Sequence, residues 1–430
     1  MTGRNDQDID GFFSTARVAG RDQAVELPDT DYTAFLLDHD DPKLADVRGM
    51  SYEEFTADRY RAPFLRDLLA VWRGLYDEPF RGITSDGLVR ENLYAPADLE
   101  PDPEPYRAAE RLLATLTPAE RQAVSHSLDD PLWRAWSNPE FVVHRVGLRL
   151  ENLTPAKSSA ILGVLRASLS PEGYDRVTAA MELNGVLGRL VDLPAVMNER
   201  SYWFSLFGSP DPANPWGWQL FGHHVAVSFV AVGGRQVIAP VFLGAEPDGA
   251  PGSPPLFAHR ERLALRLAGS LDTAQRAQAV VYESVLDPKM PEGRLHPADE
   301  RHVAGAFRDN RVVPYEGLEV SRLDPGRQAL LREIVEDFLL LLKPPQRAVT
   351  LAEYDAHLGE TWLAWYGATD GSQPFYLRVH SPVILAELDH HAGVWLGNRL
   401  PARFHVHTTL RHPNGNDYGR ALLGRARFSG

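Results

Sequence analysis

The sequence predicts an α+β protein in which a helical N-terminal half packs on a largely antiparallel β-sheet. Apolar residues recur at three- and four-residue steps across 52–192, which is typical of amphipathic helices. Aromatic and β-branched runs fill 202–243 and return in 374–410, which is typical of strands. Helices therefore come first along the chain, strands follow in two groups, and helices lie between the groups. This order favours the α+β class.

The N-terminal segment differs from the rest of the chain. Residues 1–50 are polar and acidic, so we expect a partly extended arm before a single domain over 51–430. In the helical half, three helices are expected to begin where a Ser or Thr cap precedes a proline at the first helical position. The caps are Thr117, Thr154 and Ser170.

The second half of the chain begins with a predicted β-hairpin. Runs over 225–232 and 237–243 flank Gly233-Gly234, a pair suited to a tight turn. The expected order then continues with a helix over 261–282, an irregular connection over 284–315, helices over 331–342 and 351–365, and strands around 374–389 and 402–410. An irregular connection as long as 284–315 is often functional or mobile.

Composition excludes several classes of protein. The 58 Asp and Glu residues against 44 Lys and Arg give a formal net charge of -14, which disfavours nucleic acid and anionic membrane surfaces as partners. The chain has no cysteine, so disulfides, thiolate nucleophiles and cysteine-ligated metals are excluded. The longest apolar stretch, 338–342, is too short to span a bilayer, and the start lacks a signal-peptide pattern. We therefore expect a cytoplasmic protein.

Histidines cluster in the predicted strands. Of 15 histidines, seven lie in three short segments, at 223–224, 380–391 and 405–407. Alternate residues of a strand share a face, so His405 and His407 should point the same way, about 7 Å apart along the strand. By the same alternation, His223 and His224 should point to opposite faces. We prefer His224 as a ligand, because it would share the less apolar face.

These segments predict a site for a divalent metal ion. Two or three imidazoles with one carboxylate suit zinc or iron, and copper and manganese stay open. We expect one strand near residue 224 and two near residues 388 and 406 to lie in one sheet, which would bring the ligands together. The candidate metal ligands are His223, His224, Asp389, His405 and His407, with Glu387 as the other candidate carboxylate.

Three further residues are candidates for catalytic roles. Glu387, if it is not a ligand, or His390 could act as the general base. Arg411 lies four residues past His407 and could bind an anionic group of a small-molecule substrate. An internal ion pair of Arg411 with Asp417 or Glu387 is the alternative.

Four sequence blocks resemble a known family. They are FRGITSDG at 80–87, PWGWQLFGHH at 215–224, SPVILAELDH at 381–390 and HVHTTLRHPNGNDYG at 405–419. Together they are similar to the signature blocks of the family called domain of unknown function 3500. The resemblance covers about residues 64–424 and implies one continuous unit, but it implies no particular reaction. The chain departs from the family pattern at Phe221, where an acidic residue is usual, and at His391, where glutamine is usual.

The candidate ligands support three hypotheses about function. The first is an enzyme in which a metal ion activates water for a hydrolytic or lyase reaction on a small organic substrate. The second is a non-haem iron or copper oxidoreductase that uses O₂. The third is a non-catalytic binding protein whose histidines are structural. The sequence shows neither a phosphate-binding loop, nor a dinucleotide-binding motif, nor a serine nucleophile elbow.

Overall fold

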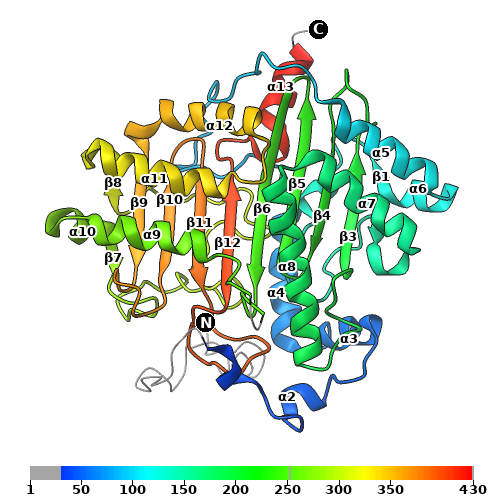
Figure 1. Cartoon of the computed structure of the whole chain (residues 1–430), viewed down its shortest axis with the longest axis horizontal. Coiled ribbons are helices and arrows are strands. Elements are labelled where there is room, and N and C mark those ends of the chain that lie inside the picture. The colour runs from blue at the N-terminus through cyan, green and yellow to red at the C-terminus, as the bar shows by residue number, and fades with distance from the viewer. Residues whose placement is uncertain (1–30, 251–252, 429–430) are drawn as a thin grey trace.

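The computed structural model describes residues 31–250 and 253–428. Within them, a sheet of twelve strands runs through the middle of the molecule in the order β1-β3-β4-β5-β6-β12-β11-β10-β9-β7, with β2 beside β3 and β8 beside β9 (Figure 1). Two pairings of this sheet, β1 with β3 and β7 with β9, are parallel and the others are antiparallel. The predicted α+β class is confirmed.

The strands of the sheet come from both halves of the chain. The first group contains β3 (Tyr202–Phe207), β4 (Trp216–Gly222), β5 (Val225–Val232) and β6 (Arg235–Ala245). The second contains β9 (Trp362–Tyr366), β10 (Tyr376–His380), β11 (Leu385–His390) and β12 (Val406–Arg411). Short strands complete it: β1 (Ser125–His126), β2 (Leu148–Arg149), β7 (Val280–Tyr282) and β8 (Leu318–Glu319).

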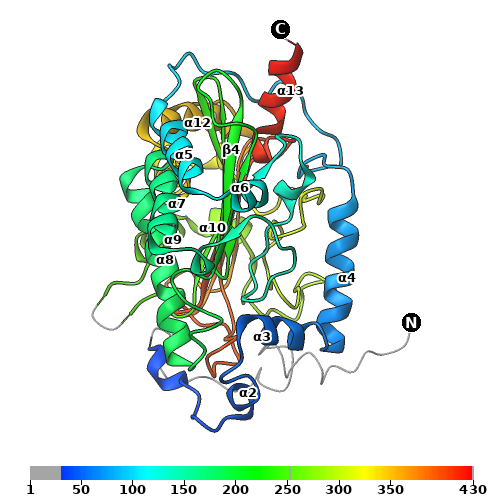
Figure 2. The same cartoon turned by 90° about the vertical axis from the view of Figure 1, so that its right-hand side faces the viewer.

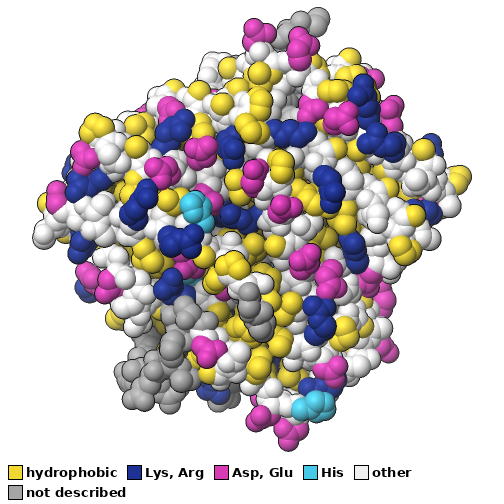
Figure 3. Space-filling view, viewed as in Figure 1, with side chains coloured by type: hydrophobic (Ala, Val, Ile, Leu, Met, Phe, Trp, Pro, Cys, Tyr) yellow, Lys and Arg dark blue, Asp and Glu magenta, His cyan; other side chains and the backbone are white. Residues whose placement is uncertain are grey.

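One face of the sheet is covered mainly by helices. These are α5 (Pro103–Thr115), α7 (Pro155–Ser168), α8 (Pro171–Leu190), α9 (Ala258–Ser270), α11 (Pro325–Phe338) and α12 (Pro344–Ala356). Figure 2 shows the sheet edge-on with several of them on one side. Their apolar residues and those of the strands form the largest hydrophobic core. On the outer surface of these helices, positive and negative side chains are interspersed (Figure 3).

The opposite face is covered by the long helix α4 (Pro63–Asp77) and by extended loops (Figure 2). A second hydrophobic core lies there, formed by α3 (Tyr52–Arg59), α4, the loop around Trp133 and Phe141, and parts of the later loops. The small helices α2 (Pro42–Ala45), α6 (Pro118–Val124), α10 (Thr273–Ala279) and α13 (Arg420–Phe428) complete the described elements together with short 3-10 turns. None of the helices in the described part of the chain has the length and apolar character needed to cross a bilayer.

Several sequence predictions of local structure are confirmed. The hairpin β5–β6 turns at Gly233-Gly234, and Thr117 forms the predicted capping box with Glu120. The segment 284–315 forms neither helix nor strand, as expected.

The described part of the N-terminal segment, residues 31–50, lies against the domain, because Leu44 and Val47 are buried in the second core. The sequence had indicated a partly extended arm. Residues 1–30 lie outside the described residues.

Two predicted helices are wrong in extent. The helix expected over 261–282 is divided into α9 and α10, because Asp272 caps a new helix by accepting a hydrogen bond from the Gln275 amide. The helix expected over 351–365 ends at Ala356. The aromatic run that follows forms β9, whose residues pair with β10 across the sheet.

Candidate metal centre

The predicted histidines meet at one end of four neighbouring strands. In antiparallel strands, the start of one lies beside the end of the next, so the beginnings of β5 and β12 adjoin the ends of β6 and β11. The register places Asp389 opposite His407 and His407 opposite Gly244. This end of the sheet lies in the lower part of Figure 1, near α2 and α3.

His223 and His224 form the turn between β4 and β5, which corrects the prediction that they alternate across a strand. Gly222 pairs with Val225, so the two histidines are the two loop residues of the hairpin. His224 has a φ of 64°, and its ring stacks on that of His223 with centroids 3.8 Å apart. Turn geometry therefore puts both rings on the same side, and strand parity does not apply to them.

The first candidate ligand set is the three-histidine group, which consists of His224, His405 and His407. One ring nitrogen from each lies within 4.8 Å of the others. His405 Nε2 and His407 Nε2 are 3.1 Å apart. The predicted convergence of segments near residues 224 and 406 is therefore confirmed, with His224 as the member of the adjacent pair that takes part.

Gly244 of β6 makes the close approach of these rings possible. A β-carbon at this position would lie 2.8 Å from His407 Cδ2 and 3.1 Å from His224 Cδ2. Both contacts are shorter than ordinary van der Waals separations, so a side chain at residue 244 would displace the two rings. The β-carbon would also lie 2.9 Å from the Val406 carbonyl oxygen of the neighbouring strand, so the close strand pairing and the rings both require glycine here.

The four histidines that line the cavity are held in the state that binds metals. Burial, followed by the charges of neighbouring imidazoles, lowers the pKa of His224, His391 and His407 well below the usual value. Burial also lowers the pKa of His223 to about 3. Neutral imidazoles keep a lone pair on one nitrogen, which is the form that a metal requires.

A second ligand set, the His302 group, adjoins the first. It consists of His302, Asp389 and His391, again with ligand atoms within 4.8 Å of one another. The rings of His391 and His407 have centroids 3.9 Å apart, so the two groups are in contact. Asp389 was predicted as a ligand beside His405 and His407; it lies instead in this adjoining group.

His302 could not be identified from the sequence. It belongs to the irregular segment 284–315, where strand alternation gives no orientation. The segment is held over β11 because Glu387 accepts hydrogen bonds from the amides of Val303 (2.9 Å) and Ala304 (3.0 Å). These contacts bring the His302 ring nitrogen Nδ1 to 3.5 Å from Glu387 Oε2.

Glu387 is a positioning residue in this structure and not a free base. Besides the two amides, its carboxylate accepts a hydrogen bond from the Tyr376 hydroxyl at 2.6 Å. Although burial acts in the opposite direction, His302 and these hydrogen bonds lower the pKa of Glu387 to about 2. A carboxylate with such a low pKa and with its lone pairs already engaged is a poor proton acceptor at neutral pH.

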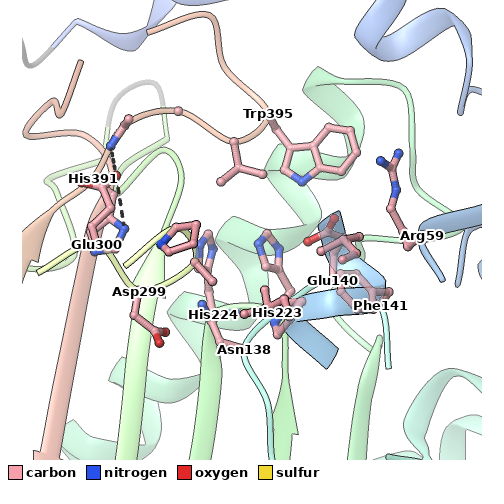
Figure 4. A pocket seen from close by; sticks show the side chains of 18 of the residues that line it. Arg59, Asn138, Glu140, Phe141, His223, His224, Asp299, Glu300, His391 and Trp395 are labelled. Atoms are coloured by element: carbon pink, nitrogen blue, oxygen red, sulfur yellow. Dashed lines mark hydrogen bonds and ion pairs between the residues drawn. The ribbon is translucent and has the colours of Figure 1, made fainter. Parts of the chain in front are cut away.

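A cavity of about 270 Å³ opens above the histidines. His223, His224, His391 and His407 line it, whereas His405 is buried behind them. In Figure 4, His391 and Glu300 lie at one side of the cavity and Arg59 and Glu140 at the other. The remaining lining includes Lys43, Asn138, Phe141, Asp299 and Trp395.

A loop after β11 closes the cavity on the side of Trp395 (Figure 4). Buried Glu246 fixes this loop, because its Oε1 accepts hydrogen bonds from the amides of Val394 (2.9 Å), Trp395 (3.0 Å) and Leu396 (2.9 Å). The same loop orients a ligand: His405 Nδ1 donates to the carbonyl of Ala392 at 2.7 Å. Because this contact uses Nδ1, Nε2 is the nitrogen of His405 that lies beside His407 and could bind a metal ion.

His390 lies on the other face of the sheet from the cavity. Its Nε2 is 3.1 Å from Glu261 of α9, and its Nδ1 lies 3.0 Å from the backbone of Phe375. Successive residues of β11 alternate between faces, so Asp389 points to the centre and His390 points away. The prediction of His390 as a general base is therefore wrong.

Arg411 forms the internal ion pair that the sequence left as the alternative. Its Nε donates to Asp417 Oδ2 at 2.8 Å, a second nitrogen pairs with Asp309, and a third donates to the carbonyls of Ala304 and Gly305. The side chain is fully buried, and Arg411 is not among the residues that line the cavity. The structure thus gives this guanidinium a structural role in place of substrate binding.

The chain belongs to a family without a known activity. A sequence model of the family described as "Protein of unknown function (DUF3500)" matches residues 101–420, which is most of the 430 residues. The resemblance stated from the sequence blocks is confirmed, and three of the four blocks lie inside the match. No curated protein and no solved structure matches the chain.

Proposed function

We propose that this protein is a metal-dependent enzyme whose three-histidine group binds a divalent transition-metal ion at the base of the cavity. The observation that carries the proposal is the convergence of three buried imidazoles from two distant parts of the chain. Isolated buried histidines are common as structural residues. Here, by contrast, three buried histidines each place a ring nitrogen within 4.8 Å of the other two, as ligands of one ion would.

The spacing of the nitrogens suits a metal. Bonds of 2.0–2.1 Å in tetrahedral geometry place two ligand nitrogens about 3.3 Å apart. The separation of 3.1 Å between His405 Nε2 and His407 Nε2 is close to this value. Three protein ligands leave a coordination position for water or substrate, as in catalytic zinc sites. Because His224 and His407 line the cavity, that position would face the cavity.

The reaction we favour is hydrolysis or lyase chemistry on a small organic molecule. A metal ion lowers the pKa of a bound water to near 7 and polarises a substrate oxygen. Glu140 lines the cavity and is our candidate for proton transfer in place of Glu387 and His390. Burial raises the pKa of Glu140, and a carboxyl group that transfers protons near neutral pH needs such a shift.

The cavity also suggests the kind of substrate. Its volume of about 270 Å³ suits a small molecule. Lys43 of α2 and Arg59 of α3 are cations among its lining residues, and burial lowers the pKa of both. An anionic group of a substrate would compensate the loss of water around these cations. The sequence suggested Arg411 as the residue that binds such a group, and we assign this role to Lys43 instead.

One observation favours a second candidate function. Two histidines and one carboxylate, the composition of the His302 group, are typical of non-haem iron oxygenases. If this group alone holds iron(II), the protein would be an oxidoreductase that uses O₂. Oxygen consumption by the iron-loaded protein with candidate anionic substrates distinguishes this function from hydrolysis.

Metal analysis of the full chain tests the main proposal. Protein purified without chelators should contain at least one equivalent of a transition metal, and His407→Ala should lose the equivalent bound by the three-histidine group while its circular dichroism stays unchanged. His390→Gln is the matched control, since this residue lies on the other face of the sheet, and it should keep its metal. A wild-type protein that binds no transition metal, or full occupancy in His407→Ala, would support the reading that the histidines are structural.

A further inference from the structure

We propose that the His302 group is a second metal site, so that the centre holds two ions side by side. This inference deepens the proposed function and rests on it, because it assigns a partner to the ion of the three-histidine group. The residues of the second site are His302, Asp389 and His391, which come from the irregular segment 284–315 and from the end of β11.

Unsatisfied nitrogens are the first argument. His302 Nε2 and His391 Nε2 are buried and have no hydrogen-bond partner among the described residues. The two side chains are only 2% and 3% exposed. A buried polar atom without a partner costs about 1–3 kcal/mol, so His302 Nε2, which makes neither a hydrogen bond nor an ion pair among the described residues, indicates a missing ligand, and His391 Nε2 has only an ion-pair contact. His391 Nε2 also lies 3.2 Å from Asp389 Oδ2, a separation that suits two donors to one ion.

The surroundings of His302 are the second argument. Its Nδ1 is 2.8 Å from the Thr409 hydroxyl and 3.5 Å from Glu387, so the carboxylate and hydroxyl fix the ring and direct Nε2 away from them. A carboxylate behind a histidine is the usual arrangement at metal sites, where it sets the tautomer and makes the ligand more basic. Glu387 would thus act through His302.

The fixed carboxylate of Asp389 is the third argument. Arg301 Nε donates to Asp389 Oδ1 at 2.6 Å, and the Arg301 amide donates to Oδ2 at 3.2 Å. These contacts orient the carboxylate, so that Oδ2 faces His391. Ligating carboxylates are commonly held by such hydrogen bonds.

The charge around the centre is the fourth argument. Besides Asp389, which belongs to the second group, three carboxyl groups lie beside the two ligand groups and are buried or nearly so: those of Glu246, Glu300 and Glu387. Arg301 lies among them as a positive charge. Buried carboxylates are costly unless cations compensate them, and two divalent ions would do so.

A pair of ions would suit the reaction proposed above. Paired metal ions in hydrolytic enzymes lie roughly 3.5–4 Å apart. At this separation they stabilise both the attacking oxygen and the leaving oxygen of the reaction. The ring contact between His391 and His407, with centroids 3.9 Å apart, brings the two ligand groups close enough for such a pair. One ion would activate water while the other binds a substrate oxygen.

Cobalt titration of the full chain, monitored by visible absorption, tests the second site. We expect wild-type protein to reach its endpoint at two equivalents of Co²⁺, and both His302→Ala and His405→Ala to reach it at one. His390→Gln should keep two equivalents. Asp389→Asn offers a milder change to the same site, and should weaken the second binding step at least tenfold.

The outcomes separate the two proposals. A wild-type endpoint of one equivalent of Co²⁺ overturns the second site. If His405→Ala then binds no Co²⁺, the single ion belongs to the three-histidine group and the proposed function still stands. Two equivalents that persist in both His302→Ala and Asp389→Asn would also overturn the second site. A wild-type chain that binds no Co²⁺ and contains no transition metal contradicts both proposals. The number of Co²⁺ equivalents bound by the wild-type chain tests the second site even if a variant fails to fold.

Discussion

The two faces of β11 and β12 are equally buried but chemically opposite. On the helix-covered face lie Ala386, Leu388, Val406 and Leu410, all part of the largest core. On the loop-covered face lie Glu387, Asp389, His407 and Arg411, which are also buried. Burial alone therefore does not decide whether a strand residue is apolar. The cover of the face matters as well, and on the helix-covered face the polar exception, His390, has a helix side chain, Glu261, as its partner.

Helices and loops differ in what they offer to a buried polar group. The backbone of a helix is hydrogen-bonded to itself, so a helix presents only side chains to the sheet. A loop has amides and carbonyls that are free to bond side chains. In the segment 303–305, two amides donate to Glu387, and two carbonyls accept hydrogen bonds from Arg411. The loops over the second face thus make charged side chains tolerable there, and this is where a metal centre can be built.

The largest expected effect on stability comes from Arg411, a fully buried charge of the loop-covered face. Arg411→Ala leaves Asp417 without its cation and leaves Asp309 with Arg134 alone, and breaking such a buried pair costs about 3–5 kcal/mol. Urea unfolding measures the loss, and metal content of the folded variant should stay unchanged. Arg332→Ala removes a half-exposed pair with Asp355 and should cost under about 1 kcal/mol. Equal losses in the two variants would contradict this account.

The helix-covered face should also lose stability when it is changed, but through lost apolar packing and not through an unpaired charge. Leu388→Ala leaves a cavity in the largest core, and such changes cost about 2–5 kcal/mol. The neighbours of Leu388 on β11 face the metal centre, yet we expect the variant to bind metal with unchanged stoichiometry. Loss of metal in Leu388→Ala, measured on protein that remains folded, would show that the two faces are not independent.

Sequence periodicity predicted the strands and their pairing better than the loops that cover the metal centre. The α+β class, the β5–β6 hairpin and the convergence of His405 with His407 all follow from alternation or from three- and four-residue steps. Alternation also implies that His390 points away from Asp389, so the same rule that brings the ligands together argues against His390 as a base at this centre.

The rest of the centre depends on loops, whose conformation no periodicity describes. His302 lies in the irregular segment 284–315, and its place depends on the amides that bind Glu387. His224 lies in a two-residue turn with positive φ, so strand parity gave the wrong orientation for its pair. The length of 284–315 was the available signal, since long irregular segments in compact domains often carry functional residues.

Acid should destabilise the protein through histidines that are buried without charge. Burial, followed by the charge of Arg378, lowers the pKa of His380 on β10 to about 3. In the unfolded chain its pKa is near 6.5, so the unfolded state takes up a proton between these values and the folded state does not. Stability is therefore full above pH 6.5 and falls as the pH decreases towards 3.

The slope attributable to one such histidine is at most about 1.4 kcal/mol per pH unit. Urea unfolding of metal-free protein at pH 7, 6, 5 and 4 measures it. His380→Phe keeps a ring beside Tyr315, whose centroid is 4.6 Å away, and should flatten the dependence on pH. An unchanged slope in this variant would show that His380 already takes up a proton in the folded state.

The smallest expected effect concerns Lys43. This residue belongs to the short helix α2, which contributes to the lining of the cavity on the loop-covered face. Lys43→Met keeps the length of the side chain and removes its charge, so an anionic ligand loses one ionic contact. Acetate and phosphate are suitable probes, because their binding at the metal alters the visible spectrum of the cobalt-loaded protein. We expect dissociation constants about tenfold higher, equivalent to about 1.4 kcal/mol.

Lys289→Met changes an exposed lysine that is not among the lining residues, and should leave both constants unchanged. If Lys43→Met binds both anions as tightly as wild type, the cavity does not select an anion through Lys43, and the substrate class assigned to it is wrong.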